Sequence, residues 1–246
     1  MLVEDGHRIV RFGDLKWEPR TEDRWPCLTK RQLFDPDRDL TMRIVWYARD
    51  AIEPRHVHPG THAAFVLVGQ ANVGGQSLGP WDIVYGPGGV PHGPLHYPVG
   101  CMLFVMLDGG ALHQAVQGEE GVALAKGQPS QTIVESHVPW IEPEGNADGW
   151  PCQRKLLLED TARGYTAMLV RWAPGTTEPR HTHAGTHASL ILQGRAVVNG
   201  AELGPWDLIY GPGDVPQGPI SFPEGCTMAV SFKGSYQHRR IVSAQE

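Results

Sequence analysis

Short apolar runs alternate with turn residues along most of the chain. The runs are rich in Val, Ile, Leu and Phe, and Gly or Pro bounds them every ~8–12 residues, which is typical of strands joined by tight turns. With 30 Gly and 21 Pro among 246 residues, long helices are disfavoured. We therefore predict an all-β fold of sandwich or barrel type. The clearest runs are 42–47, 63–68, 83–85 and 102–107, with counterparts at 167–172, 188–192, 208–210 and 228–232.

The same sequence occurs twice in the chain. A shift of 125 residues places Trp81 on Trp206 and Cys101 on Cys226, and the register holds without a gap over 25–109. Such self-similarity indicates a duplicated domain. We expect an N-terminal domain with a leading arm at 1–110, a linker at 111–132 and a C-terminal domain at 133–246. Each copy is large enough for one small barrel.

Seven of the 12 histidines fall at positions that match between the copies. In a strand, residues i and i+2 share a face, so His56 and His58 project side by side. His62 can join them only if the chain bends, and Gly60 is suited to a bend. His92 follows a Pro- and Gly-rich turn that can return the chain to the same place. Imidazoles so arranged suit a divalent first-row ion. The candidate ligands are His56, His58, His62 and His92 in copy one, and His181, His183, His187 and Gln217 in copy two.

These residues resemble the motifs of the cupin superfamily. The segment His56-x-His58-x3-His62-x6-Gly69 resembles the first cupin motif, G-x5-H-x-H-x3-4-E-x6-G. Pro87-x-Gly89-x2-His92 resembles the second, P-x-G-x2-H-x3-N. Both copies carry the resemblance, so the chain is similar to a bicupin. The resemblance implies two tandem jelly-roll barrels, each of the double-stranded β-helix type.

The chain departs from the motifs at ligand positions. His62 and His187 replace the usual Glu, as in four-histidine cupins, and Gln217 replaces the last histidine of copy two. The motif's final Asn is His96 in copy one and Ser221 in copy two. Neutral ligands favour M²⁺ over M³⁺, and imidazoles suit Fe, Mn, Ni, Co, Cu or Zn. Among these ions, Fe(II) is the one that the resemblance to histidine-only cupin dioxygenases implies. Site two is either a weaker or different metal site or a structural remnant.

Several other residues have competing interpretations. Tyr85 and His96 are candidate proton-transfer residues, and core packing is the alternative for Tyr85. Strand alternation predicts that Arg55, Glu53 and their counterparts Arg180 and Glu178 face away from the metal. We expect them to form ion pairs at a domain–domain or subunit contact, with substrate binding as the alternative. The four histidines without a matched partner are expected at the surface: His7, His113, His137 and His238.

The last apolar strand differs between the copies on one face. Met102, Phe104 and Met106 become Thr227, Ala229 and Ser231, whereas the alternate face stays apolar. The variable face lines either the cavity or an interface, and the sequence does not decide between them. The matched cysteines are expected to be buried thiols. The alternative is a disulfide between Cys27 and Cys101 and another between Cys152 and Cys226.

Charge and hydropathy argue against nucleic acid and membranes as partners. The net charge of -6 lacks the basic footprint of a nucleic-acid binder. No apolar run is long enough for a membrane span, and no secretory signal is evident, so we expect a cytoplasmic protein. The resemblance to cupins adds a homodimer as a further expectation.

The resemblance to histidine-only cupins that cleave diketones implies a non-haem dioxygenase. Four histidines leave up to two positions of an octahedron for substrate and O2. The substrate would be a small carbonyl, diketone or hydroxylated compound. Two alternatives stay open: a lyase or isomerase that uses the ion as a Lewis acid, and a non-catalytic small-molecule sensor.

Overall fold

The computed structural model describes residues 2–4, 7–20, 27–109, 114–116, 129–142 and 151–241. These residues form two compact units. The first barrel is the unit Leu15–His137, and the second barrel is the unit formed by Met1–Asp14 with Val138–Glu246. His113 and most of the predicted linker lie outside the described residues. Trp25, Pro26 and Trp150 of the matched Trp-Pro-Cys segments also lie outside them.

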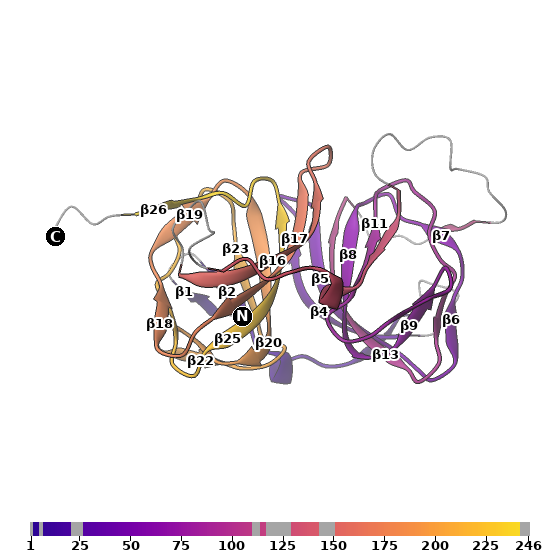
Figure 1. The fold of residues 1–246 in the computed structure, drawn as a ribbon, viewed down its shortest axis with the longest axis horizontal. Helices are drawn as coiled ribbons and strands as arrows, with labels where there is room; N and C mark the ends of the chain where they lie inside the picture. The colour runs from indigo at the N-terminus through magenta and orange to yellow at the C-terminus, as the bar shows by residue number, and fades with distance from the viewer. Residues whose placement is uncertain are drawn as a thin grey trace. The chain divides into compact units, whose positions relative to one another are not determined.

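All strand pairing in the first barrel is antiparallel (Figure 1). A seven-stranded sheet has the order β15-β11-β8-β13-β5-β4-β3, a four-stranded sheet has the order β10-β9-β12-β6, and β14 pairs with β7. The strands are β3 (Glu18–Arg20), β4 (Cys27–Asp35), β5 (Leu40–Tyr47), β6 (Ala51–Glu53), β7 (His56–Val57), β8 (His62–Gly69), β9 (Ala71–Val73), β10 (Gln76–Leu78), β11 (Ile83–Gly86), β12 (Leu95–Tyr97), β13 (Cys101–Asp108), β14 (Gln114–Ala115) and β15 (Gln131–Ile133), followed by the 3-10 turn η3 (Glu135–His137).

The second barrel repeats this arrangement (Figure 1). Its sheets have the orders β1-β2-β23-β20-β25-β17-β16 and β18-β24-β21-β22, and β19 pairs with β26. The elements are β1 (Leu2–Glu4), β2 (His7–Val10), the 3-10 turn η1 (Phe12–Asp14), β16 (Cys152–Asp160), β17 (Tyr165–Trp172), β18 (Thr176–Glu178), β19 (His181–His183), β20 (Thr186–Gly194), β21 (Ala196–Val198), β22 (Ala201–Leu203), β23 (Leu208–Gly211), β24 (Ile220–Phe222), β25 (Cys226–Lys233) and β26 (His238–Arg240).

The sequence repeat is also a repeat of backbone conformation. Trp81 and Trp206 both have positive φ, at 75° and 73°. The peptide bonds Gly93–Pro94 and Gly218–Pro219 are both cis. Each barrel has an apolar core built from the inward faces of its strands, with Val66 and Leu103 in the first and Ile191 and Met228 in the second. The predicted all-β fold of two tandem barrels is confirmed. Within the described residues no helix has the length and apolar character needed to cross a bilayer.

The leading arm differs from its predicted place. We expected residues 1–14 to belong with the N-terminal domain, but β2 pairs with β23 of the second barrel, Ile9 opposite Ile209. The matching strand β15, at the end of the predicted linker, pairs with β11 of the first barrel. Each pairing covers an otherwise open edge strand, which supplies the physical reason for the exchange. Each barrel therefore takes its outermost strand or strands from the arm that precedes the other copy.

Candidate metal centres

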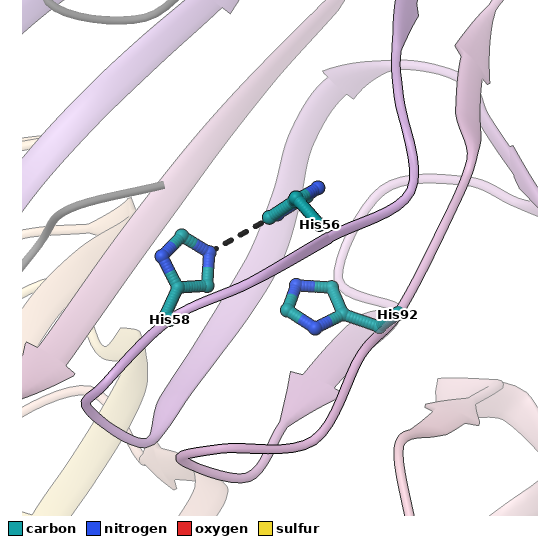
Figure 2. Close-up of side chains that lie close together, drawn as sticks. All are labelled: His56, His58 and His92. Atoms are coloured by element: carbon teal, nitrogen blue, oxygen red, sulfur yellow. Dashed lines mark hydrogen bonds between the residues drawn. The ribbon is translucent and has the colours of Figure 1, made fainter. Parts of the chain in front are cut away.

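Four buried imidazoles meet inside the first barrel. The ring of His92 lies 4.3 Å from His56, 5.2 Å from His58 and 4.8 Å from His62, centroid to centroid. His58 and His62 are 4.6 Å apart. Figure 2 shows the rings of His56, His58 and His92 close together, with a dashed line between His56 and His58. The predicted first set of ligand residues is thus brought to one place from β7 and the residue after it, the start of β8, and the bridge residue His92.

Backbone contacts fix how these rings are presented. His56 and His92 are bridge partners with two backbone hydrogen bonds of 2.9 Å. The Nδ1 of His56 lies 2.7 Å from the carbonyl oxygen of Pro54, and the Nδ1 of His92 lies 3.1 Å from that of Val90. A carbonyl at Nδ1 fixes the proton there and leaves Nε2 with a lone pair, the usual arrangement for a metal ligand.

Small residues make room for the cluster. The bend predicted between His58 and His62 is present, and Gly60 packs so tightly there that a Cβ would meet the carbonyl oxygen of Asp108 at 1.4 Å. Gly86 lies under the ring of His62, where a Cβ would meet Cε1 at 2.2 Å. The Thr61 hydroxyl accepts a hydrogen bond from the Gly88 amide at 3.0 Å and ties the two ligand-bearing loops together.

Glu53 lies inside the barrel, contrary to the prediction that it faces outward. Its Oε1 is 3.6 Å from His56 Nε2, and its Oε2 accepts a hydrogen bond of 2.7 Å from the Tyr97 hydroxyl. Strand β6 ends at Glu53 and β7 starts at His56, so Pro54 and Arg55 break the alternation on which the prediction depended. A carboxylate therefore stands beside the four imidazoles, although the sequence pattern indicated a site without an anionic group.

Two arginines join the histidines in the wall of this cavity. Arg20 from β3 and Arg43 from β5 line it together with Glu53 and the four histidines. Guanidinium groups bind carboxylate and other anionic oxygens through paired hydrogen bonds. Sequence reasoning missed both arginines, because each comes from a strand distant from the histidine motifs.

In the second barrel, two carbonyls fix the tautomers of facing imidazoles. His181 Nδ1 donates to the Pro179 oxygen at 2.8 Å, and His183 Nδ1 donates to the Tyr236 oxygen at 3.0 Å. In neutral rings both Nε2 atoms then carry lone pairs, and they lie 3.0 Å apart. Lone pairs at that distance repel each other unless a cation lies next to both. Burial, with a contribution from the charge of His181, lowers the pKa of His183 to about 3. A metal ion bound to both Nε2 atoms would remove the repulsion between their lone pairs.

His187 and Gln217 complete the predicted second set. Both are buried, and His187 lies 5.0 Å from His183 between ring centroids. Burial, followed by the nearby charge of His183, lowers the pKa of His187 well below its usual value. Gln217 is the bridge partner of His181, as His92 is of His56. The amide reaches the space above Gly211, where a Cβ would meet Gln217 Oε1 at 2.0 Å.

Glu178 differs from Glu53 in its surroundings. Its Oε1 is 3.6 Å from His181 Nε2, and it forms a compact potential donor group with His181 and His183. The stacked pair Tyr47 and Tyr97, which hydrogen-bonds Glu53, is replaced here by the stacked pair Trp172 and Phe222. Burial raises the pKa of Glu178, and the charges of His181 and Arg154 partly oppose that rise. Glu178 was also predicted to face outward, and Pro179 breaks the alternation in the same way.

Two histidines expected at the surface belong to the second centre instead. His7, on β2, is fully buried, and its ring lies 6.4 Å from that of His187. His238, on β26, is the strand partner of His183 and lines the cavity, with its ring 5.9 Å from that of His183. Neither residue falls in a matched position, so the repeat gave no signal for them. His137 is exposed, as expected.

The weaker candidates lie apart from the cavities. Tyr85 is fully buried in β11 and is not among the residues that line the first cavity. His96 is half-exposed on β12, with Nε2 3.8 Å from Asp50 Oδ1, and it does not line the cavity either. All four cysteines are buried thiols. Burial raises the pKa of Cys101 and of Cys226 to about 12.

The last strand of each barrel presents its shared apolar face to the cavity. Leu103, Val105 and Leu107 line the first cavity, and the second is lined by their counterparts Met228, Val230 and Phe232. The variable face, which includes Phe104, is buried on the other side of the strand. The alternative in which that face shapes the cavity is therefore wrong. The cavities have volumes of about 40 Å³ in the first barrel and about 50 Å³ in the second.

The donor sets fit a divalent ion. The Nε2 atoms of His56 and His58 are 3.1 Å apart, and those of His181 and His183 are 3.0 Å apart. Two nitrogens each ~2.1 Å from one ion and at right angles to each other would be ~3.0 Å apart. In each barrel these atoms are buried and lie beside a carboxylate. The geometry of both donor sets is therefore compatible with a bound divalent ion.

Comparison with known proteins agrees with this architecture. Residues 130–236 match the profile of the ChrR cupin-like domain. No curated protein sequence is significantly similar to the chain.

Solved structures resemble the whole chain at low sequence identity. A Nostoc punctiforme protein described as a "putative dioxygenase" superposes with a TM-score of 0.80 at 13% identity, covering 97% of this chain and 88% of that one. Lactobacillus farciminis oxalate decarboxylase, in a formate complex, gives 0.66 at 14% identity, with 98% and 90% covered. A variant of the Bacillus subtilis oxalate decarboxylase, an enzyme with Mn(II) centres, gives 0.64 at 16% identity, with 98% and 80% covered. The chain thus has the bicupin fold, two tandem cupin barrels in one polypeptide.

Proposed function

We propose that the chain is a metal-dependent oxidoreductase, a non-haem dioxygenase that acts on a small enolisable carbonyl compound in the first barrel. The observation that carries the proposal is the convergence of His56, His58, His62 and His92 in a cavity that two arginines also line. Fe(II) is the metal we favour. When bound, such an ion polarises the substrate and brings it together with O2.

Other side chains of the first cavity would bind the substrate and exclude water. Arg20 and Arg43 bind anionic oxygens of the substrate and so favour a β-diketone, a hydroxyketone or a 2-oxo acid over a neutral hydrocarbon. The apolar wall formed by Leu103, Val105 and Leu107 excludes water from the substrate's carbon chain.

Glu53 is the residue best placed to accept a proton. Its Oε1 lies beside His56, and Tyr97 holds Oε2. When a C–H bond next to a carbonyl breaks, the proton goes to Glu53 Oε1 and the electron pair forms an enolate. The arginines then stabilise the enolate oxygens.

The test is oxygen uptake by the iron-loaded protein with a panel of β-diketones, hydroxyketones and 2-oxo acids. We expect uptake with at least one class, and no uptake by His58→Ala. The exposed His137→Ala is the matched control and should keep wild-type rates. Turnover retained by His58→Ala would refute the proposal.

A second candidate is a lyase or isomerase that uses the ion as a Lewis acid. The carboxylates of Glu53 and Glu178 favour it, because each lies 3.6 Å from an imidazole nitrogen and can carry a proton without any oxidant. Equal turnover with and without O2 would select this candidate. Tight substrate binding with no turnover in air would instead select a small-molecule sensor.

A further inference from the structure

His7 reaches the second centre through the pairing of the N-terminal arm. In the sheet, Arg8 lies opposite Tyr210, and Gly211 lies opposite His187. One residue further along this register, His7 lies opposite Gly211. His7 and His187 therefore stand on either side of a glycine, in one row across β2, β23 and β20.

The space above Gly211 is where polar side chains gather. A Cβ at Gly211 would meet Gln217 Oε1 at 2.0 Å and His187 Cε1 at 2.2 Å. His7 approaches from the opposite side, with its ring edge-on to His187 at 6.4 Å. Two imidazoles that share one ion ~2.1 Å from each Nε2 have ring centroids at most ~6.5 Å apart. His7 is within reach of an ion held by His187.

Polar atoms in this row have no hydrogen-bond partner among the described residues. They are both ring nitrogens of His7, Nδ1 of His187 and both amide atoms of Gln217, and all are buried. A buried polar atom left unsatisfied costs ~1–3 kcal/mol. Several such atoms around one space indicate that a ligand belongs there.

Comparison with the first barrel shows which residues take the positions of His7 and Gln217 there. The Phe12 amide donates to Asp207 Oδ1 just as the Glu135 amide donates to Asp82 Oδ1, so residue 7 corresponds to Ser130. In that barrel the fourth imidazole is His92, which neighbours both His56 and His62. In the second barrel His7 neighbours the equivalent residues, since it contacts His187 and lies close enough to His181 for the two charges to interact.

We propose that His7 supplies the fourth imidazole of the second metal centre, beside His181, His183 and His187, so that the N-terminal arm completes that centre. The first barrel carries His92 and Ser130, and the second carries Gln217 and His7. The fourth imidazole thus comes from the loop in the first barrel and from the arm in the second. This proposal rests on the metal-dependent function proposed above.

The experiment measures Co²⁺ binding by visible absorption in a His58→Ala background, which silences the first centre. Adding His7→Ser should weaken binding at least ~10-fold and change the d–d spectrum, because a ligand is lost. Adding Gln217→His to that variant gives the second barrel the side chains of the first. This third change should restore the Co²⁺ affinity to within about threefold of the His58→Ala parent. A role of His7 in packing alone would not predict that rescue.

Arg8→Ala is the control for docking of the arm, because Arg8 lies on the same strand over the ring of Tyr210. It should leave Co²⁺ affinity unchanged. The proposal is overturned if His7→Ser binds like its parent, if Arg8→Ala loses as much affinity, or if Gln217→His does not rescue a folded protein. A parent that binds no Co²⁺ would refute a metal function of the second barrel itself, a different outcome from an unaffected His7→Ser variant.

Discussion

The two barrels share a backbone and differ in the donors they place inside it. In the first, four imidazoles come from the two cupin-like motifs, and the carboxylate of Glu53 is held by tyrosines. In the second, three imidazoles come from the motif, and the ends of the chain add His7 and His238. Glu178 there has aromatic neighbours without hydroxyl groups. If His7 is a ligand as proposed, a duplicated barrel can keep the donors of a metal centre while one of them comes from a different segment.

The largest expected effect separates the two centres. His58→Ala should remove one equivalent of bound metal and lower turnover by at least ~1000-fold, since a lost ligand removes the ion. His183→Ala should remove the other equivalent and leave most turnover in place. Elemental analysis and rate measurements on both variants check this. Equal loss of turnover in the two would contradict a division of labour between the barrels.

A second test uses the glycines beneath the ligands. Gly86→Ala and Gly211→Ala should each weaken metal binding in their own barrel ~10-fold or more, because the added Cβ displaces His62 or His187 at 2.2 Å. Gly79→Ala and Gly204→Ala are matched controls, since a Cβ there meets nothing within 4 Å. Titration with a competing chelator gives the affinities. If the control variants lose as much metal affinity as the test variants, the loss does not come from displaced His62 or His187.

Tyr97→Phe makes the first barrel resemble the second. It removes the hydrogen bond of 2.7 Å to Glu53, and we expect the free energy of unfolding to fall by about 1.5–3 kcal/mol. The converse change, Phe222→Tyr, offers Glu178 a donor and should have a smaller effect. Urea unfolding of the two variants measures both. No loss of stability in Tyr97→Phe would show that the phenol does not hold the carboxylate.

The smallest effect concerns buried thiols, which the barrels share. Burial, followed by the charge of Glu53, raises the pKa of Cys101 from its usual value of 9.0 to about 12. Between these values the unfolded thiol loses its proton and the folded one keeps it, so stability is intact below pH 9 and falls as pH rises. The slope is ~1.4 kcal/mol per pH unit for one thiol. Cys101→Ala should remove that part of the slope, and an unchanged slope would contradict the burial effect.

Much of the fold and part of the site could be predicted from local spacing. The apolar runs predicted the strands, and the spacing of His56, His58, His62 and His92 predicted which imidazoles meet, because i and i+2 share a strand face. His7 could not be predicted, because its place depends on which edge strand the arm pairs with. Glu53 was misplaced because the proline after it interrupts the alternation. The same error recurs at Glu178, the matched position of the second copy, so comparing the two copies could not reveal it.

The most direct test of the central claim is an anomalous-difference map from crystals of the metal-loaded wild-type protein. The account predicts one peak in each barrel, within ~2.3 Å of Nε2 of His56 and His58 in the first and of His181 and His183 in the second. Full loading with no peak near these nitrogens, or with peaks bound only to surface groups, would contradict it.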